Sequence, residues 1–315
     1  MSATKPPPDT TVADAVRGHW ADRWIPPAIR PYARLARLER PIGWWLLLWP
    51  CWWSAALAAV ASHRPWPDPW HLVLFLVGAV AMRGAGCTYN DIVDRDIDAM
   101  VARTRSRPIP SGRVTVAQAR AFMLALALVG FLVLIQFNRF AVVTGIASLG
   151  TIAIYPFMKR VTDWPQFVLG LAFSWGALMG WAAAFGRLDP AAFALYAGCI
   201  LWTIGYDTIY AHQDKEDDAV VGVRSTALLF AGATRPALSA FYAAAVMLIL
   251  VAFRLAGVGP AGYLGLAGMA AHLAWQVRRL DIDDPDTCLM LFRANRMTGW
   301  ILFVGLVVDA WARAG

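Results

Sequence analysis

Nine apolar runs, each roughly long enough to cross a bilayer, constrain the fold of this chain more than any other feature. A membrane-spanning helix needs about 20 predominantly apolar residues, and such runs recur from residue 42 almost to the C-terminus. The predicted spans are 42–61, 70–89, 119–137, 140–157, 165–186, 190–211, 236–256, 259–277 and 297–312, of which the last is the shortest. The sequence therefore predicts an all-α, polytopic membrane protein with about nine transmembrane helices.

Composition supports this fold class and excludes others. Apolar residues make up 59% of the 315 residues and charged residues only 16%, whereas soluble domains carry about 25% charged residues. The net charge of +7 does not indicate nucleic-acid binding, because nucleic-acid-binding domains do not carry this much apolar sequence. The four cysteines, Cys51, Cys87, Cys199 and Cys288, stand singly and without the spacing of a zinc site or a disulfide framework.

The distribution of lysine and arginine predicts the orientation in the membrane. With nine spans, 22 of these residues fall on the side of the N-terminus and five on the opposite side. Cytoplasmic loops carry the excess of positive charge, so we expect the N-terminus and the loops after even-numbered spans to face the cytoplasm. Mitochondrial transit peptides are poor in acidic residues, whereas the N-terminal arm of this chain contains Asp9, Asp14 and Asp22. We therefore expect a multi-pass protein of a bacterial cell inner membrane.

The chain is predicted to form one transmembrane domain, residues 29–315, preceded by a disordered, basic cytoplasmic arm over residues 1–28. Three consecutive prolines and few apolar residues are typical of a disordered segment. From Ile29 to Arg40, arginines alternate with apolar residues. This pattern fits a short amphipathic helix on an anionic leaflet, or equally a plain basic flank that sets orientation.

Acidic residues gather at the cytoplasmic ends of two spans. The first group begins at the end of span 2, where one helical face would carry Asn90, Asp91, Asp94 and Asp98. The second group begins at the end of span 6, where one face would carry Asp207, Tyr210, Asp214 and Asp218. Asp96 and Asp217 lie off these faces and are expected to be solvated.

Carboxylates that share a helix face near an apolar boundary repel one another, so a cation must offset them. Mg²⁺ fits, because it takes one or two carboxylates and shares substrate phosphates. Two solvated acidic loops are the alternative, but they do not explain why helical spacing recurs on two similarly placed spans. The sequence therefore predicts a magnesium site.

Basic residues beside the acids complete a site for a diphosphate. Arg105 and Arg107 follow the first group, and Lys159 and Arg160 end span 4. Together with Mg²⁺ they would neutralise a diphosphate leaving group. Arg83 lies inside span 2, where an arginine either binds a carboxylate substrate or pairs with an acid.

A diphosphate site that opens onto an apolar interior suits a substrate with a charged head and a long lipid tail, such as a polyprenyl diphosphate. Departure of the diphosphate leaves an allylic cation, which must be shielded from water. Aromatic faces stabilise such a cation. Tyr155 and Tyr210 adjoin the predicted site and are the candidates for this role.

The two acidic stretches, 90–98 and 207–218, resemble the two aspartate-rich motifs of the UbiA family of intramembrane aromatic prenyltransferases. The resemblance extends, in the same order along the chain, to residues 37–43, 82–87, 105–112, 155–160 and 222–226.

The resemblance implies nine helices around a central cavity, with the two motifs facing each other on the cytoplasmic side. It implies that the motif acids bind the diphosphate through Mg²⁺, and that Lys159, Arg160 and, less specifically, Arg40 contact substrate. The implied substrates are a polyprenyl diphosphate and 4-hydroxybenzoate, which is alkylated ortho to its hydroxyl in an early step of ubiquinone synthesis. Membrane lipid is the expected surrounding partner.

Two alternatives remain at this level. One is a prenyltransferase with another aromatic acceptor, such as a naphthoate, a homogentisate, a haem or a chlorophyllide. The other is a divalent-cation transporter, with the acids as its permeation site. A transporter needs polar groups toward the outer side too, and the outer halves of the spans are almost free of them, with Asp309 as the exception.

Overall fold

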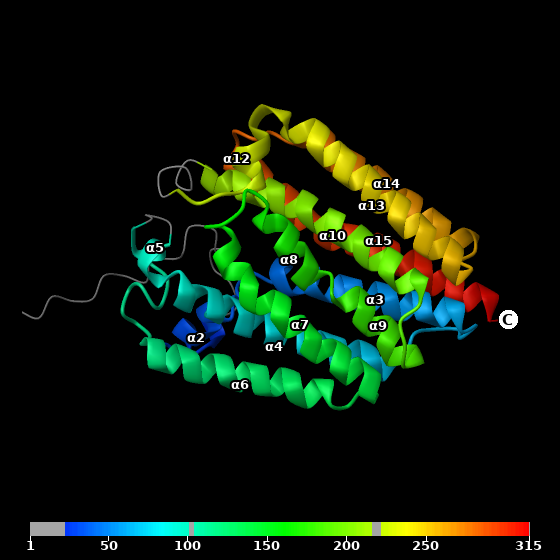
Figure 1. Cartoon of the computed structure of the whole chain (residues 1–315), viewed down its shortest axis with the longest axis horizontal. Coiled ribbons are helices and arrows are strands. Elements are labelled where there is room, and N and C mark those ends of the chain that lie inside the picture. The colour runs from blue at the N-terminus through cyan, green and yellow to red at the C-terminus, as the bar shows by residue number, and fades with distance from the viewer. Residues whose placement is uncertain (1–22, 101–103, 216–221, 315) are drawn as a thin grey trace, which may run out of the picture. The chain divides into compact units, whose positions relative to one another are not determined.

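The computed structural model describes residues 23–100, 104–215 and 222–314, and in this part every regular element is a helix (Figure 1). The longer helices are α3 (Ile42–Ala61), α4 (Pro69–Val93), α6 (Val116–Leu134), α7 (Arg139–Met158), α10 (Pro190–Ala211), α13 (Thr234–Ala256), α14 (Pro260–Arg279) and α15 (Pro285–Arg313). The shorter ones are α2 (Arg30–Leu35), α5 (Arg95–Met100), α8 (Pro165–Phe173), α9 (Gly176–Phe185), η1 (His212–Asp214), α12 (Thr226–Phe230) and η2 (Ala231–Ala233). The all-α prediction is confirmed.

Eight helical stretches of the described chain are long and apolar enough to cross a membrane, with α8 and α9 counted as one. The eighth predicted span, 259–277, corresponds to the helix α14, which carries the polar residues His272 and Gln276 and does not reach that apolar standard. The prediction of about nine spans therefore holds closely, and the protein is a multi-pass membrane protein.

The predicted bounds of two spans, 42–61 and 190–211, coincide with α3 and α10. The last span was predicted too short. It was expected at 297–312, but α15 begins at Pro285, because Asp284 caps its first turn through the backbone N–H of Asp286. The span 165–186 is interrupted between α8 and α9, at Ser174 and Trp175.

The chain divides into two compact units. The first contains the described residues of Met1–Gly43 and Ala81–Val129, and the second contains Trp44–Val80 and the described residues of Gly130–Gly315. The predicted boundary between an arm and a single domain at residue 29 stays a prediction, since residues 1–22 lie outside the described chain.

The first unit packs α2, the end of α4 and the segment before α6 around a small apolar core. Its buried members are Leu35, Ile92, Ile109, Val114 and Ala119. The segment 29–40 forms a helix only over α2, and it does not lie with its arginines outward. Arg34 and Arg37 are 7% and 8% exposed, so this segment belongs to the interior of the first unit.

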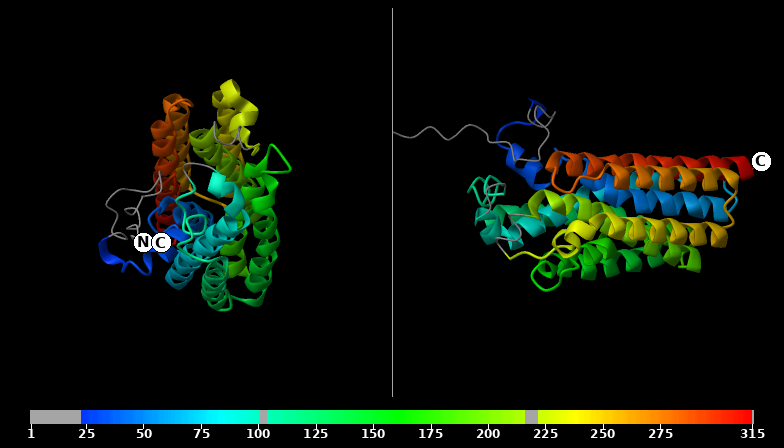
Figure 2. Two further views of the ribbon diagram at one scale, coloured as in Figure 1. Left: turned by 90° about the vertical axis from the view of Figure 1, so that its left-hand side faces the viewer. Right: turned by 90° about the horizontal axis from the view of Figure 1, so that it is seen from above.

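In the second unit, α10, α13, α14 and α15 run side by side (Figure 2). The backbones of α14 and α15 approach most closely at two glycines. A Cβ atom on Gly305 would lie 2.6 Å from the Cα of Gly265. Small residues permit this approach between membrane helices, where van der Waals packing replaces the hydrophobic drive.

Apolar side chains are exposed on several helices, and α6 and α7 are the least buried of the long apolar helices. Leu124 is 63% exposed on α6, and Val143 is 67% exposed on α7. Soluble monomers rarely leave continuous apolar surface of this kind open to water. These faces are therefore the ones that lipid covers.

Candidate active site

The first acidic group straddles the end of α4. The helix breaks at Asp94, yet the backbone N–H groups of Asp94 and Asp98 still donate to the carbonyls of Asn90 and Asp94, at 2.9 and 2.8 Å. The i, i+4 spacing therefore survives the break, and Asn90 Nδ2 donates to Asp94 Oδ2 at 2.9 Å.

Burial separates the acids of this group as the sequence predicts. Asp91, Asp94 and Asp98 are 1%, 1% and 5% exposed. The side chain of Asp96 is 82% exposed and lies 3.5 Å from Arg95. The prediction that Asp96 is solvated is therefore confirmed.

Two arginines neutralise part of this buried charge. Arg37 Nη2 donates to both oxygens of Asp91, at 2.7 Å to Oδ1 and 3.0 Å to Oδ2. Arg107 Nη1 donates to Asp98 Oδ2 at 2.7 Å and approaches Asp91 Oδ1 at 3.3 Å. The pair formed by Arg37 and Asp91 joins two segments that are 54 residues apart in the sequence.

Charge balance at Asp98 remains unfavourable despite Arg107. Burial raises the pKa of the Asp98 carboxyl above its ordinary value, Arg107 opposes this effect, and the neighbouring charges of Asp91 and Asp94 add to it. A further cation beside these carboxylates would favour the ionised form.

The other predicted cations of the first unit differ in exposure. Arg105 is exposed and Arg107 is largely buried, with a side chain 13% exposed. Arg40 lies beside Glu39, with Nε 3.3 Å from Oε1. The guanidinium of Arg83 lies over Gly43, where a Cβ atom would be 2.6 Å from Nε.

The second acidic group begins on the last turns of α10. Asp207 and Tyr210 are half-buried there, and Asp214 belongs to η1. Asp217 and Asp218 lie outside the described residues, as does the side chain of Asp214. Beside this group, burial lowers the pKa of His212 to about 4, with a smaller contribution from Lys215, so the ring is neutral at pH 7.

Hydrogen bonds bring the ends of α7 and α10 together through the segment before α12. The hydroxyls of Thr208 and Thr226 lie 2.6 Å apart. The backbone N–H of Thr226 donates to Gln166 Oε1 at 3.0 Å, and that of Arg224 donates to the carbonyl of Lys159 at 2.9 Å. Tyr155, Lys159 and Arg160 thus belong to the same end of the second unit as Asp207.

The ring of Tyr210 has a partner that sequence reasoning missed. Phe292 of α15 packs against it with ring centroids 4.4 Å apart, and Tyr206 contacts Phe292 at 5.9 Å. Phe292 stands in a helix with no motif, so no sequence signal marks it. Arg37 lies in the stretch 37–43, but its pairing with Asp91 was missed because the two residues are 54 positions apart in the sequence.

The carboxylates do not form a complete metal site within the described residues. In that part of the chain, no group of three or more His, Cys, Asp or Glu side chains is arranged to hold a metal. The donor chemistry nevertheless fits Mg²⁺, which needs only one or two carboxylates when phosphates and water supply the rest.

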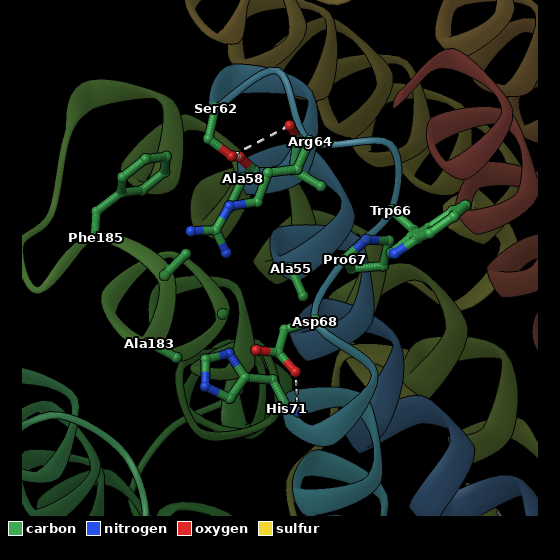
Figure 3. Close-up of a pocket in the computed structure, with 13 residues that line it drawn as sticks. Ala55, Ala58, Ser62, Arg64, Trp66, Pro67, Asp68, His71, Ala183 and Phe185 are labelled. Atoms are coloured by element: carbon green, nitrogen blue, oxygen red, sulfur yellow. Dashed lines mark hydrogen bonds between the residues drawn. The ribbon is translucent and has the colours of Figure 1, made fainter. Parts of the chain in front are cut away.

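A separate pocket of about 160 Å³ lies at the opposite end of α3, beside α9 and the start of α4 (Figure 3). Small alanines and the polar residues Ser62, Arg64, Asp68 and His71 line it. Asp68 Oδ1 accepts from the backbone N–H of Trp70 at 2.8 Å and so caps α4. None of the predicted site residues lines this pocket.

The fold and these two groups define an all-helical, multi-pass membrane protein with carboxylates and cations gathered at helix ends. The chain belongs to the UbiA prenyltransferase family, whose model matches residues 47–306. The resemblance predicted from the motifs is confirmed.

Two curated relatives are called 4-hydroxybenzoate polyprenyltransferase, mitochondrial. The one from Aedes aegypti is 50% identical over 279 residues, which cover 88% of this chain and 63% of the relative. The one from Bos taurus is 47% identical over 294 residues, which cover 92% of this chain and 78% of the relative. The chain thus spans less than two thirds of the mosquito protein.

Two solved structures share the fold. An apo UbiA homologue from Aeropyrum pernix K1 has a TM-score of 0.70 at 24% identity and covers 84% of this chain and 97% of its own. A UbiA homologue from Archaeoglobus fulgidus, bound to GPP and Mg²⁺, has a TM-score of 0.63 at 17% identity and covers 90% of this chain and 99% of its own.

Proposed function

We propose that this chain transfers a polyprenyl group from polyprenyl diphosphate to the ring carbon of 4-hydroxybenzoate that lies ortho to the hydroxyl. The observation that carries the proposal is the cluster of buried carboxylates and arginines at the end of an apolar helix, α4. The names of the curated relatives support the acceptor, and membrane lipid supplies the donor.

The reaction breaks the bond between the allylic carbon and the diphosphate oxygen. The diphosphate leaves with the electron pair of that bond, the allylic carbon bonds to the ring carbon, and the ring carbon then gives up its proton to the released diphosphate or to water. Apolar spans exclude the water that would otherwise capture the cation. Tyr155 and Tyr210 offer ring faces to that cation, and the packing of Phe292 holds the ring of Tyr210 in place.

Mg²⁺ is the proposed cofactor, and when bound it neutralises the charge that develops on the leaving diphosphate. The first group would hold it through Asn90, Asp94 and Asp98. In the second group, Asp207, Asp214 and Asp218 are the candidate ligands. The archaeal homologue solved with GPP and Mg²⁺ supports this cofactor. Asp91 is a predicted member of the same site, but arginines surround it.

The diphosphate itself is bound by cations, which make charge-assisted hydrogen bonds to its oxygens. Lys159 and Arg160, at the end of α7, are the candidates for this contact in the second unit, and Arg40, Arg105 and Arg107 are the candidates in the first unit.

The excess of lysine and arginine supports an N-terminus and an active site on the cytoplasmic side of a bacterial inner membrane. The curated relatives are mitochondrial, so the inner mitochondrial membrane is the competing location. Labelling of single cysteines introduced at residues 113 and 187 with an impermeant reagent tests the orientation. We expect residue 187 alone to react from outside intact cells, and reaction of residue 113 alone would reverse the orientation.

The function is tested with purified protein in detergent, Mg²⁺, one polyprenyl diphosphate and a panel of acceptors. We expect the mass of 3-polyprenyl-4-hydroxybenzoate. A product only with a naphthoate, homogentisate, haem or chlorophyllide would keep prenyl transfer and change the acceptor. Divalent-cation flux into liposomes without any prenyl transfer would replace the proposal with a transporter.

A further inference from the structure

Asp91 and Asp98 differ in how many of their carboxylate oxygens accept hydrogen bonds from arginine. Arg37 Nη2 donates to both carboxylate oxygens of Asp91, and Arg107 Nη1 adds a second contact to Oδ1. Asp98, in contrast, accepts from Arg107 through Oδ2 alone, and its Oδ1 accepts no hydrogen bond among the described residues.

The positive charges around Asp91 make its carboxylate a poor ligand for a metal cation. Two guanidinium groups lie within 3.3 Å of Asp91 Oδ1, and the carboxylate is 1% exposed. A divalent cation that bound this carboxylate would meet two positive charges at close range in a poorly screened environment. The carboxylate is therefore better placed to hold the arginines than to hold Mg²⁺.

The backbone of Arg37 shows that this pairing is built into the fold. Arg37 has a φ of 55°, in the left-handed region that side chains other than glycine avoid. Its Nη1 donates to the carbonyl of Arg34 at 2.8 Å, and the residue is 8% exposed. Strained conformations persist where the surrounding contacts determine them, and they gather at functional sites.

Arg107 receives its position from the same carboxylate. Its Nη1 bridges Asp91 and Asp98, and its buried Nε has no hydrogen-bond partner among the described residues. A buried donor without an acceptor is costly, and a phosphate oxygen would satisfy it.

We propose that Asp91 is a positioning residue that holds Arg37 and Arg107 for the diphosphate of the donor, and is not a magnesium ligand. This proposal rests on the proposed function, since it names the substrate group that the arginines meet. It assigns the motif two tasks: Asp94 and Asp98 serve the metal, and Asp91 serves the arginines.

The first test measures thermal unfolding of the full chain in detergent with EDTA, for Arg37→Gln, Asp91→Asn and the double variant. We expect each single variant to lower Tm and the double variant to lower it no further than the more damaging single one. Additive losses of Tm would overturn the pairing. Asp96→Asn is the matched control, and its Tm is expected to equal that of the wild type.

The second test measures Mn²⁺ binding by electron paramagnetic resonance, which needs no turnover, and then the KM for the diphosphate donor. Asp91→Asn is expected to leave the Mn²⁺ Kd unchanged and to raise the donor KM at least about tenfold, the loss of one charge-assisted hydrogen bond. Asp94→Asn is expected to weaken Mn²⁺ binding at least about tenfold. Equal weakening of Mn²⁺ binding by both variants would overturn the proposal.

If Asp91→Asn does not fold, Asp91→Glu replaces it, because glutamate keeps the charge and displaces the arginines by one methylene. We expect an unchanged Mn²⁺ Kd with a raised donor KM, and a weakened Mn²⁺ Kd would overturn the proposal. Because the Tm and Mn²⁺ measurements need no prenyl transfer, a chain without that activity would refute the proposed function separately from the pairing.

Discussion

Two buried polar clusters in this chain differ in charge, in place and in what they do. The first unit buries the ionic cluster, which consists of Arg37, Asp91, Asp94, Asp98 and Arg107. The second unit buries the neutral cluster, which consists of Trp202, Tyr242, His272, Gln276, Asn295 and Thr298.

The neutral cluster satisfies its own hydrogen bonds. Asn295 Oδ1 accepts from Trp202 Nε1 at 2.9 Å, and Asn295 Nδ2 donates to Gln276 Oε1 at 3.2 Å. Gln276 Nε2 donates to the hydroxyl of Thr298 at 3.2 Å. Gln276, Asn295 and Thr298 are fully buried, so these amides join α10, α14 and α15 and explain why α14 tolerates polar residues within a span.

In the ionic cluster, by contrast, some hydrogen-bonding groups are not satisfied by other members of the cluster. Arg107 Nε has no acceptor among the described residues, and burial raises the pKa of Asp98. Buried ions contribute little stability compared with apolar residues of the same size. We therefore propose that the neutral cluster mainly stabilises the fold, whereas the ionic cluster binds a charged ligand.

Removal of the metal is expected to have the largest effect on prenyl transfer. It should act through the ionic cluster and leave the neutral cluster unchanged. EDTA should lower prenyl transfer at least about 1000-fold, because a metal supplies several kcal/mol of charge stabilisation. Added Mg²⁺ should restore it. The assay follows product mass over time, and full activity in EDTA would contradict a metal-dependent site.

Loss of a diphosphate contact should come next. Lys159→Ala is expected to raise the donor KM about 10- to 100-fold, the value of a hydrogen bond to a charged group. Arg187→Ala is the control, because Arg187 pairs with Asp189 in an exposed loop. Initial rates against donor concentration measure both variants, and equal KM values would remove Lys159 from the site.

A larger side chain between α14 and α15 tests how much their close packing contributes to the stability of the second unit. Gly305→Ala would place a Cβ atom 2.6 Å from Gly265 Cα, and it should destabilise the protein by about 1–3 kcal/mol. Gly150→Ala, on α7, meets nothing within 4 Å and serves as the control. Thermal unfolding in detergent should show a lower Tm for the first variant alone.

The smallest effect is expected at Asp309, the acid that stood out in the outer half of the spans. Its carboxylate is 1% exposed and accepts from the backbone N–H groups of Gly259, at 2.7 Å, and Gly262, at 3.2 Å. It therefore caps α14 from α15. Asp309→Asn keeps one acceptor and should cost less than about 1 kcal/mol, seen as a small fall in Tm without loss of activity.

The sequence predicted the elements whose signals are local. Span length located α3 and α10, and i, i+4 spacing placed Asn90 beside Asp94 even across the break in the helix. The start of α15 escaped prediction because Asn295 and two arginines interrupt its apolar run, and only the structure shows Asn295 turned into the neutral cluster.

Partners far apart in sequence could not be predicted. Arg37 and Asp91 are 54 residues apart, and the strained backbone that aims Arg37 inward depends on contacts of the folded first unit. Phe292 contacts the ring of Tyr210 only because α15 packs against α10. Periodicity predicts which face a residue takes, but packing decides which side chain it meets.

We propose that the ionic cluster serves prenyl transfer and that the neutral cluster stabilises the fold. Measuring kcat/KM and Tm together for Asp94→Ala and Asn295→Ala tests this division of roles. Asp94→Ala should lower kcat/KM at least about 100-fold in the protein that still folds. Asn295→Ala should cost about 1–3 kcal/mol of stability, because it leaves buried partners unpaired, and folded protein should keep its kcat/KM. Full kcat/KM in Asp94→Ala, or loss of kcat/KM without loss of Tm in Asn295→Ala, would contradict the account.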